Sequence, residues 1–231
     1  MPYINVESVT KRFERPEGAV LALSEVSLTI ERGEFIGISG PSGAGKSTLF
    51  NIISGLDRCT SGAVTVDDAE LSKLSTDKLA LFRRAKVGFV FQSSALLPAL
   101  TVFENVMLPL VPIAVPDADK RARVERALEA VNIAHRASHL PSELSGGEQQ
   151  RTAIARAVVN DPELILADEP TADLDVDNAT NIIELLEQLN GAGKTILLTS
   201  HDASTVGAAK RIIRMESGKI VEWQGRGRGN G

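Results

Sequence analysis

A glycine-rich segment that ends in Lys-Ser-Thr carries the clearest chemical signal in the sequence. It matches the pattern G-x-x-x-x-G-K-[ST] and lies between an expected strand, residues 34–39, and an expected helix, residues 45–53. Glycines let backbone N–H groups close around phosphate oxygens, and the helix N-terminus adds positive potential. Lys46 is expected to reach the β- and γ-phosphates of a nucleotide, and Ser47 to bind Mg²⁺. We therefore predict a nucleotide-phosphate site formed by Gly40, Pro41, Ser42, Gly43, Ala44, Gly45, Lys46, Ser47 and Thr48.

Two adjacent carboxylates follow an apolar run later in the chain. Asp168 and Glu169 come directly after residues 164–167, which are typical of a buried parallel strand. If this strand ends beside the phosphate site, Asp168 would hold Mg²⁺ through water and Glu169 would polarise the attacking water. The alternative is a solvated turn, because Asp-Glu-Pro is typical of turns. The four apolar residues before the pair favour the catalytic interpretation.

Residues 144–151, Leu-Ser-Gly-Gly-Glu-Gln-Gln-Arg, resemble the LSGGQ signature of ABC ATPases, with Glu148 where many members have glutamine. Ser145, Gly146 and Gly147 would form the N-terminus of a helix, which attracts anions. In that family the helix faces the γ-phosphate held by the other subunit. The resemblance implies that Ser145, Gly146, Gly147 and Glu148 contact ATP bound by a second copy, so that two ATP molecules lie inside a head-to-tail homodimer.

Two further polar residues match the family at the ends of expected strands. Gln92 follows the apolar run 87–91 and resembles the Q-loop glutamine, which meets Mg²⁺ or water and senses the transmembrane partner. His201 follows the run 195–200 and resembles the switch histidine that contacts the γ-phosphate. The resemblance makes Lys46, Glu169 and His201 the catalytic residues, and Ser47, Gln92 and Asp168 the metal ligands.

Two other positions match less closely. Phe13 stands where the family commonly has an aromatic residue, more often tyrosine, that stacks on adenine, although any phenylalanine could belong to the core instead. Asp175 ends the segment 172–175, which resembles the D-loop that crosses the dimer seam. Asp173 in that segment departs from the more usual alanine or asparagine. The resemblance assigns Phe13 and Asp175 to nucleotide binding.

The elements that must position these residues alternate between short apolar runs and helical patterns, which predicts an α/β fold. The resemblance specifies a P-loop NTPase fold of the ABC ATPase type, with a mixed or parallel sheet core, an N-terminal antiparallel β region and an inserted helical subdomain. We expect one domain over residues 1–224, with its core in residues 1–91 and 161–224 and the helical subdomain in residues 92–160. Residues 225–231, Gly-Arg-Gly-Arg-Gly-Asn-Gly, are expected to form a flexible tail. The individual strands are expected at 26–30, 34–39, 87–91, 164–168 and 195–200 with a hairpin at 211–222, and the helices at 45–53, 117–131 and 178–189.

Composition narrows the setting in which the chain works. The formal net charge of −5 over 231 residues gives no basic footprint for nucleic acid, so we expect no nucleic-acid partner. The single cysteine suits a reducing compartment, and the N-terminal residues lack a signal-peptide pattern. Prolines and a central Glu-Asn interrupt the most apolar stretch, residues 96–115, so we expect no spanning helix. We expect a cytoplasmic protein that is peripheral on the inner face of the plasma membrane.

Several short segments resemble one branch of the family, which contains ATPases of lipoprotein release, macrolide export and cell division. They are residues 55–57, 88–92, 96–98, 101–106 and 166–171. The resemblance implies an integral membrane permease partner of the FtsX, MacB or LolC type, used in export, lipoprotein extraction or envelope mechanotransmission. An amino-acid importer ATPase shares several of these motifs, and an ATP-dependent switch for an envelope enzyme would carry the same ATP site. A DNA- or RNA-associated ABC ATPase would need coiled coils, zinc modules or a second ATPase domain, for which 231 residues leave no room.

Overall fold

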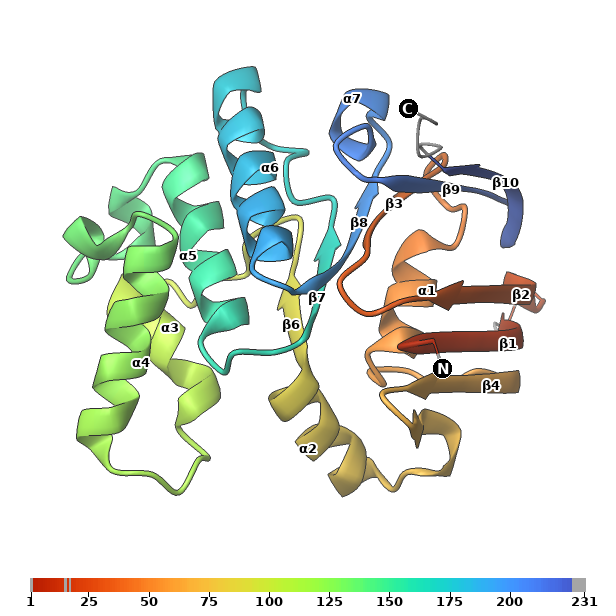
Figure 1. Cartoon of the computed structure of the whole chain (residues 1–231), viewed down its shortest axis with the longest axis horizontal. Helices are drawn as coiled ribbons and strands as arrows, with labels where there is room; N and C mark the ends of the chain where they lie inside the picture. Colours follow the sequence, from red (N-terminus) through yellow and green to blue (C-terminus); the bar gives the residue numbers. More distant parts are fainter. Residues whose placement is uncertain (1, 15, 17, 226–231) are drawn as a thin grey trace, which may run out of the picture.

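Two β-sheets form the framework of the chain. In the computed structural model, which describes residues 2–14, 16 and 18–225, one sheet has the strand order β2-β1-β4-β5 and is antiparallel. The other has the order β10-β9-β3-β8-β7-β6, with only β10 antiparallel to its neighbour (Figure 1). The strands are β1 (Ile4–Phe13), β2 (Val20–Ile30), β3 (Phe35–Ser39), β4 (Ser61–Val66), β5 (Ala69–Glu70), β6 (Val87–Val90), β7 (Leu164–Asp168), β8 (Thr195–Ser200), β9 (Arg211–Glu216) and β10 (Lys219–Gly225).

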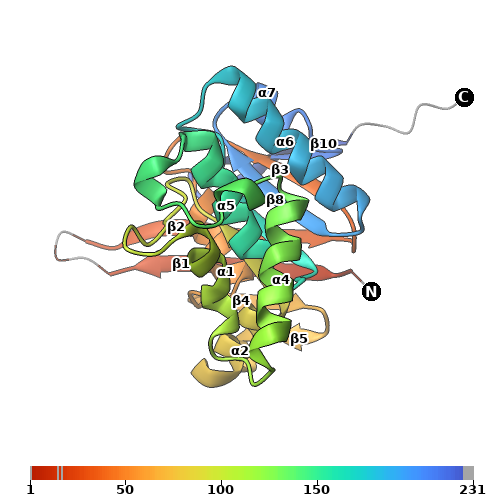
Figure 2. The same ribbon diagram turned by 90° about the vertical axis from the view of Figure 1, so that its left-hand side faces the viewer.

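The helices occupy separate faces of the larger sheet. The α-helices are α1 (Lys46–Ile53), α2 (Thr76–Lys86), α3 (Val102–Met107), α4 (Asp117–Ala130), α5 (Gly146–Val158), α6 (Val176–Gly191) and α7 (Ala203–Val206). Short 3₁₀ turns are η1 (Leu71–Lys73), η2 (Leu108–Leu110), η3 (Ala134–Arg136) and η4 (Pro141–Glu143). Helix α1 lies between the two sheets, whereas α3, α4, α5 and α6 gather on the opposite side (Figures 1 and 2).

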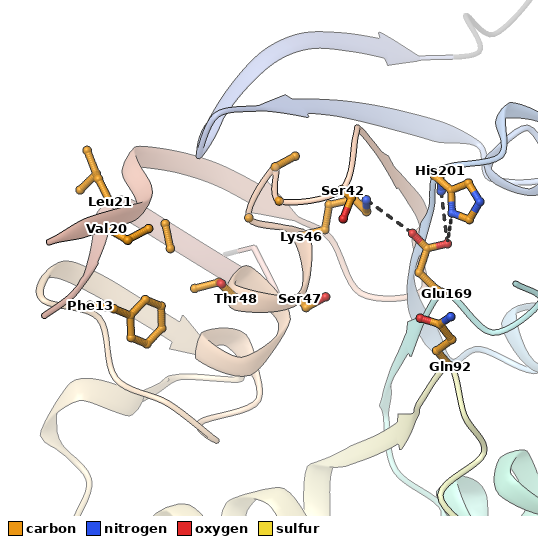
Figure 3. A pocket seen from close by; sticks show the side chains of 14 residues that line it. Phe13, Val20, Leu21, Ser42, Lys46, Ser47, Thr48, Gln92, Glu169 and His201 are labelled. Atoms are coloured by element: carbon orange, nitrogen blue, oxygen red, sulfur yellow. Dashed lines mark hydrogen bonds and ion pairs between the residues drawn. The ribbon is translucent and has the colours of Figure 1, made fainter. Parts of the chain in front are cut away.

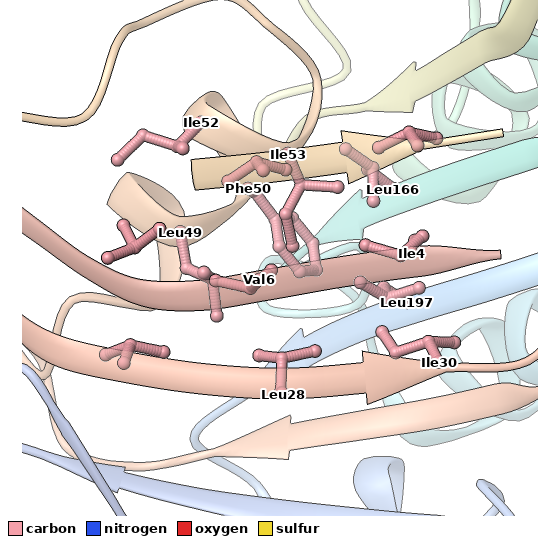
Figure 4. Packing of buried hydrophobic residues seen from close by; sticks show 14 of the residues in the cluster. Ile4, Val6, Leu28, Ile30, Leu49, Phe50, Ile52, Ile53, Leu166 and Leu197 are labelled. Carbon is pink, nitrogen blue, oxygen red and sulfur yellow. The ribbon is translucent and has the colours of Figure 1, made fainter. Parts of the chain in front are cut away.

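The central strands are buried on both faces, which explains their apolar sequences. In β7, Leu164 and Leu166 join one core cluster, and Ile165 and Ala167 join the other. The first cluster packs α1 between the sheets: Figure 4 shows Phe50 of α1 among side chains of β1, β2, β7 and β8. The second cluster joins the larger sheet to α3, α4, α5 and α6. The carboxyl ends of β3, β7 and β8 are thereby held in one rigid frame.

The predicted α/β class with an antiparallel N-terminal region and a mixed, mainly parallel second sheet is confirmed. Some boundaries differ: β2 begins at Val20 rather than at residue 26, β6 ends at Val90 rather than at 91, and α6 extends from Val176 to Gly191. Helices α3, α4 and α5 stand between β6 and β7 in the chain, where the inserted helical subdomain is expected. Gly225 ends β10, and the rest of the predicted tail lies outside the described residues. Among the described residues, no helix is long and apolar enough to cross a membrane.

Candidate functional site

The glycine-rich loop joins the end of β3 to α1 in a backbone conformation that requires glycine. Gly40 has φ 150°, and a Cβ atom there would overlap the carbonyl oxygen of Met215. Gly45 has φ 100°, and its Cβ would lie 2.6 Å from the carbonyl oxygen of Ala22. Gly45 is also the N-cap residue of α1, and no side chain caps this helix. The first N–H groups of α1 therefore stay available to an anion.

Lys46 is buried at the start of α1 and points back into the loop. Its Nζ atom donates to the carbonyl oxygens of Gly40 at 2.7 Å and Pro41 at 3.3 Å. The same Nζ lies 3.4 Å from Oε1 of Glu169. The structure thus brings together the lysine of the glycine-rich loop and the second carboxylate of the Asp-Glu pair, which are 123 residues apart (169 − 46).

Glu169 has a strained backbone and a fully partnered side chain. Its φ is 50°, in the left-handed region that non-glycine residues rarely adopt and that is common at functional sites. Its backbone N–H donates to the carbonyl and the hydroxyl oxygen of Thr199, at 3.1 and 3.0 Å. Its Oε2 accepts from the backbone N–H of His201 at 3.2 Å and lies 2.9 Å from His201 Nδ1. The carboxylate is therefore held between Lys46 and His201 (Figure 3).

Asp168 is oriented by a neighbouring strand. The hydroxyl of Thr199 donates to Oδ1 of Asp168 at 2.5 Å, and β7 and β8 pair these two residues side by side. Thr199 thus contacts both carboxylate residues, a role that was not predicted from the sequence. The available signal was its place two residues before His201 in an expected strand, but threonine is an ordinary strand residue.

A single cavity of about 700 Å³ connects Phe13, most of the glycine-rich loop, and the polar residues Gln92, Glu169 and His201 (Figure 3). Phe13 lies at one end of it, the glycine-rich loop forms its middle, and Gln92, Glu169 and His201 lie at the other end. Asp168, Gly40 and Pro41 do not line the cavity, although the carbonyl oxygens of Gly40 and Pro41 hold Lys46, which does. Part of the wall, at the start of β2, was not predicted from the sequence. The full lining is Phe13, Val20, Leu21, Ala22, Ser42, Gly43, Ala44, Gly45, Lys46, Ser47, Thr48, Gln92, Glu169 and His201.

The aromatic end of the cavity is supported by a half-buried cation. The Nζ atom of Lys11 lies 4.7 Å from the centre of the Phe13 ring, a cation–π geometry. Lys11 is itself fixed by Asp57 at 2.7 Å and by the carbonyl oxygen of Arg58 at 2.8 Å. Phe13 remains 36% exposed, so its ring can accept a flat apolar partner from the cavity.

The signature segment forms a well-built helix start outside this cavity. Ser145 caps α5: its hydroxyl accepts from the backbone N–H of Glu148 at 3.3 Å, and Glu148 accepts from the N–H of Ser145 at 2.8 Å. A Cβ at Gly147 would overlap the side-chain amide of Asn178, which would then have to move. Ser145 and Gly146 are exposed. The chain therefore presents this helix N-terminus to solvent rather than to its own glycine-rich loop.

Electrostatics at this helix start are set by Glu148. The backbone N–H of Ser145, and then Arg136 with its Nε atom 2.9 Å away, hold the pKa of Glu148 below its usual range. A carboxylate in the first turn of a helix is favourable to the helix. Asp175 plays a similar part at α6, where it caps the helix by accepting from the backbone N–H of Asn178 at 2.9 Å. This contact lowers the pKa of Asp175, which is exposed and lies outside the cavity.

Taken together, the cavity has the parts of a phosphoryl-transfer site. It offers a flat apolar surface, a loop of backbone N–H groups with a lysine, and a carboxylate placed where it can polarise water. The imidazole of His201, whose Nδ1 lies 2.9 Å from Oε2 of Glu169, places a second polar group beside this carboxylate. This arrangement can bind a nucleoside triphosphate and direct water at its terminal phosphate.

Comparison with known sequences agrees with this arrangement. The family model described as ABC transporter matches residues 23–172. The macrolide export ATP-binding/permease protein MacB of Rhodopseudomonas palustris (strain HaA2) is 44% identical over 218 residues, 94% of this chain and 33% of that protein. The chain thus spans about a third of the length of the first curated relatives that it matches. An uncharacterized ABC transporter ATP-binding protein of Thermotoga maritima is 44% identical and covers 95% of this chain and 94% of that protein.

Solved structures show the same fold. The dimeric structure of a post-hydrolysis state of the ATP-binding cassette MJ0796 bound to ADP and Pi matches this chain with a TM-score of 0.89 and 41% identity. The match covers 96% of this chain and 98% of that one. The two sheets and the helices around them are therefore arranged here as in a nucleotide-binding cassette.

Proposed function

This chain belongs to the ABC transporter family, as one of its ATP-hydrolysing cassettes, and from that premise we propose that two copies enclose two ATP molecules and drive a separate membrane partner. The observation that carries the proposal is the position of Glu169, between Lys46 of the glycine-rich loop and His201. The resemblance of the sequence to macrolide export proteins favours export or envelope work as the output.

The residues of the cavity divide the work of hydrolysis. The N–H groups of the loop and the N-terminus of α1 bind the phosphates, and Lys46 moves from the carbonyl oxygens of Gly40 and Pro41 onto them. Glu169 then orients and polarises the attacking water, and His201 contacts the terminal phosphate. Because backbone and side-chain contacts already hold Glu169, little reorganisation is needed when the substrate arrives.

The oxygen groups near the loop also fit Mg²⁺. Ser47 is exposed on the first turn of α1, Gln92 lies on the cavity wall, and Asp168 is half-buried with one oxygen engaged by Thr199. Across the described residues no group of three or more His, Cys, Asp or Glu side chains could hold a metal alone. Magnesium prefers one or two carboxylates together with substrate phosphates. We propose that Ser47, Asp168 and Gln92 hold Mg²⁺ with the nucleotide, where it would neutralise phosphate charge.

The adenine end of the site yields a prediction of its own. Phe13→Ala should raise the Kd for ATP about tenfold, because base–aromatic stacking contributes about 1–3 kcal/mol, whereas Phe13→Tyr should bind normally. Phe13→Ala should bind inorganic tripolyphosphate as the wild type does, since that ligand has no base. Calorimetry with both ligands measures this. Equal losses for ATP and tripolyphosphate, or no loss for ATP, would contradict adenine stacking on Phe13.

The second subunit is inferred from the exposed signature helix. The N-terminus of α5, with Ser145 and Gly146 exposed, attracts anions but does not reach the cavity of its own chain. A head-to-tail dimer places it at the partner's ATP, and Asp175 then lies close to the seam. MJ0796, a cassette with the same fold, forms dimers.

For the membrane partner, the most suitable surface is a groove beside β6, lined by residues of α2, β6 and the C-terminal end of α5. It measures about 700 Å³ and its wall is mainly apolar, with Leu81 52% exposed. Three arginines and one aspartate also line it, so a segment with apolar side chains and a carboxylate would fit. We propose that a cytoplasmic segment of an integral membrane permease of the FtsX, MacB or LolC type binds here, which places the chain on the inner face of the membrane. The groove is lined by Asp77, Ala80, Leu81, Arg83, Arg84, Val87, Gly88, Phe89, Pro109, Pro112, Arg156, Ala157 and Asn160.

This proposal is tested by one charge placed in the groove. The tagged chain is purified from detergent-solubilised membranes of its own cells, and integral membrane proteins that copurify are identified by mass spectrometry. We expect a permease of this type with the wild type and with Val221→Glu, an equally exposed position on β10, but not with Leu81→Glu. Failure of the wild type to capture such a permease, or capture by Leu81→Glu with an unchanged melting temperature, would contradict the proposal.

A further inference from the structure

The segment that carries Gln92 is held in place by side chains rather than by regular structure. Residues 91–101, between β6 and α3, form neither helix nor strand. The buried amide of Asn105 donates to the carbonyl oxygens of Leu97, Leu100 and Thr101, at 2.9 to 3.1 Å. This contact fixes the second half of the segment to α3. The first half, which contains Gln92, is fixed to a different helix.

Arg156 of α5 holds two consecutive carbonyl oxygens just after Gln92. Its Nη2 donates to Ser94 at 2.6 Å and its Nη1 to Ala95 at 2.7 Å. Ser94 and Ala95 have φ values of 50° and 48°, so both residues are held in the left-handed region. A backbone of this kind persists only where the surroundings determine it. The two-pronged guanidinium is such a determinant, because its donors are fixed in one plane.

The position of Arg156 is energetically demanding, which argues against an incidental contact. Burial lowers its pKa, and among the described residues no carboxylate lies within 4 Å of it. The two carbonyl oxygens are therefore the groups that compensate the guanidinium charge. Breaking this contact would leave a half-buried cation without partners, a costly arrangement. Loop and helix should consequently move together.

Gln150 completes the attachment on the other side of Gln92. Its side chain is 3% exposed, and its Nε2 donates to the carbonyl oxygen of Phe91 at 3.2 Å. Residues 91, 94 and 95 are thus all held from α5, and Gln92 stands between them. The same helix begins at Ser145, in the signature segment. Of the α5 side chains, Gln150 and Arg156 are the two with hydrogen bonds to this loop within the described part of the chain.

We infer that Arg156 and Gln150 are positioning residues for the ATPase reaction, because they fix Gln92 relative to the signature helix. The inference rests on the proposed role of Gln92 at the nucleotide. In the dimer, a helix that touches ATP in one site then sets the position of Gln92 in the other. Neither residue lines the nucleotide cavity, so both act through Gln92 and not on the substrate.

The test separates turnover from binding. Arg156→Met should lower kcat about tenfold and change the KM for ATP less than about twofold, since small displacements of a positioned group cost turnover. Arg156→Lys should recover part of kcat. Arg58→Met is the matched control, because Arg58 also donates from both Nη atoms to two backbone carbonyl oxygens, of Ser72 and Leu74, but outside the cavity. It should keep the wild-type kcat. If Arg156→Met does not fold, Gln150→Leu takes its place.

A double-mutant cycle then asks whether Arg156 acts through Gln92. In a Gln92→Ala background, Arg156→Met should have no further effect on kcat. An equal loss in both backgrounds would show an independent structural effect and overturn the inference. A normal kcat for Arg156→Met, with a reduced kcat for Gln92→Ala, would overturn the inference but leave the proposed ATPase site intact. A normal kcat for Gln92→Ala would remove the proposed role of Gln92 itself.

Discussion

Glu169→Gln is expected to bind ATP at least as tightly as the wild type and to lose at least about 100-fold in kcat, because a positioned general base contributes about 10²- to 10⁴-fold. Glutamine keeps the size of the side chain and can accept hydrogen bonds from His201, but its neutral amide cannot accept a proton from the attacking water. The change also removes the negative partner of Lys46, whose Nζ lies 3.4 Å from Oε1 of Glu169. Lys46 is then free for phosphate, so binding is not weakened.

The measurements for this variant are steady-state ATPase rates, calorimetric ATP affinity and size-exclusion chromatography with ATP. We also expect a stable ATP-bound dimer, since the ATP that joins the two chains is no longer consumed. Glu187→Gln, the same change on the exposed face of α6, is the control and should hydrolyse ATP normally. An undiminished kcat for Glu169→Gln would remove Glu169 from the catalytic machinery.

The parts of the site that the sequence could predict are those where one short segment does the whole task. The glycine-rich loop is one such part, because Gly40, Gly45 and Lys46 are read within a few residues of each other. The central strands were equally clear, because strands buried on both faces are apolar throughout. The Asp168–Glu169 pair followed from its place after such a strand.

The parts that escaped prediction depend on contacts between distant segments. β1 was not assigned individually, because its register with β2 shifts three times and interrupts the alternation that marks a strand. The wall at Val20 to Ala22 works partly through backbone, since the carbonyl oxygen of Ala22 faces Gly45, and backbone leaves no signal in the residue type. Arg156 reads as an ordinary helix residue, yet its partners lie 61 and 62 residues earlier.

The composite ATP site needs a second chain, which neither the sequence nor the fold of one chain contains. We expect specific ATPase activity to rise with protein concentration, because each composite site needs Lys46 from one chain and Ser145 from the other. ATP-bridged pairing is then concentration-dependent, as for any dimer. Rates are measured over a wide dilution range, with light scattering in ATP at each concentration. Flat specific activity from a confirmed monomer would defeat the dimer mechanism.

A mixing experiment tests the same composite site with two inactive variants. Lys46→Ala loses the cation that meets the phosphates, and Ser145→Arg places a bulky side chain on the exposed N-terminus of α5. Each alone should lose at least about 100-fold in kcat. In a mixed dimer both lesions fall on one site, and the other site has intact Lys46 and Ser145. Equimolar mixing should restore up to about a quarter of wild-type activity, since half of the dimers are mixed and each has one intact site. Chains that carry both substitutions are the control: when they pair with wild type, each site of the mixed dimer has one lesion, so these mixed dimers should be inactive. No recovery, with mixed dimers detected by native mass spectrometry, would mean that the two sites cannot act separately or that Ser145 does not serve the partner's ATP.

These two explanations are separated by mixing wild type with Lys46→Ala. If both sites must be intact, ATPase activity falls in proportion to the fraction of mixed dimers. If the mixed dimers stay active, one intact site is enough, and the failed recovery then means that Ser145 does not serve the partner's ATP.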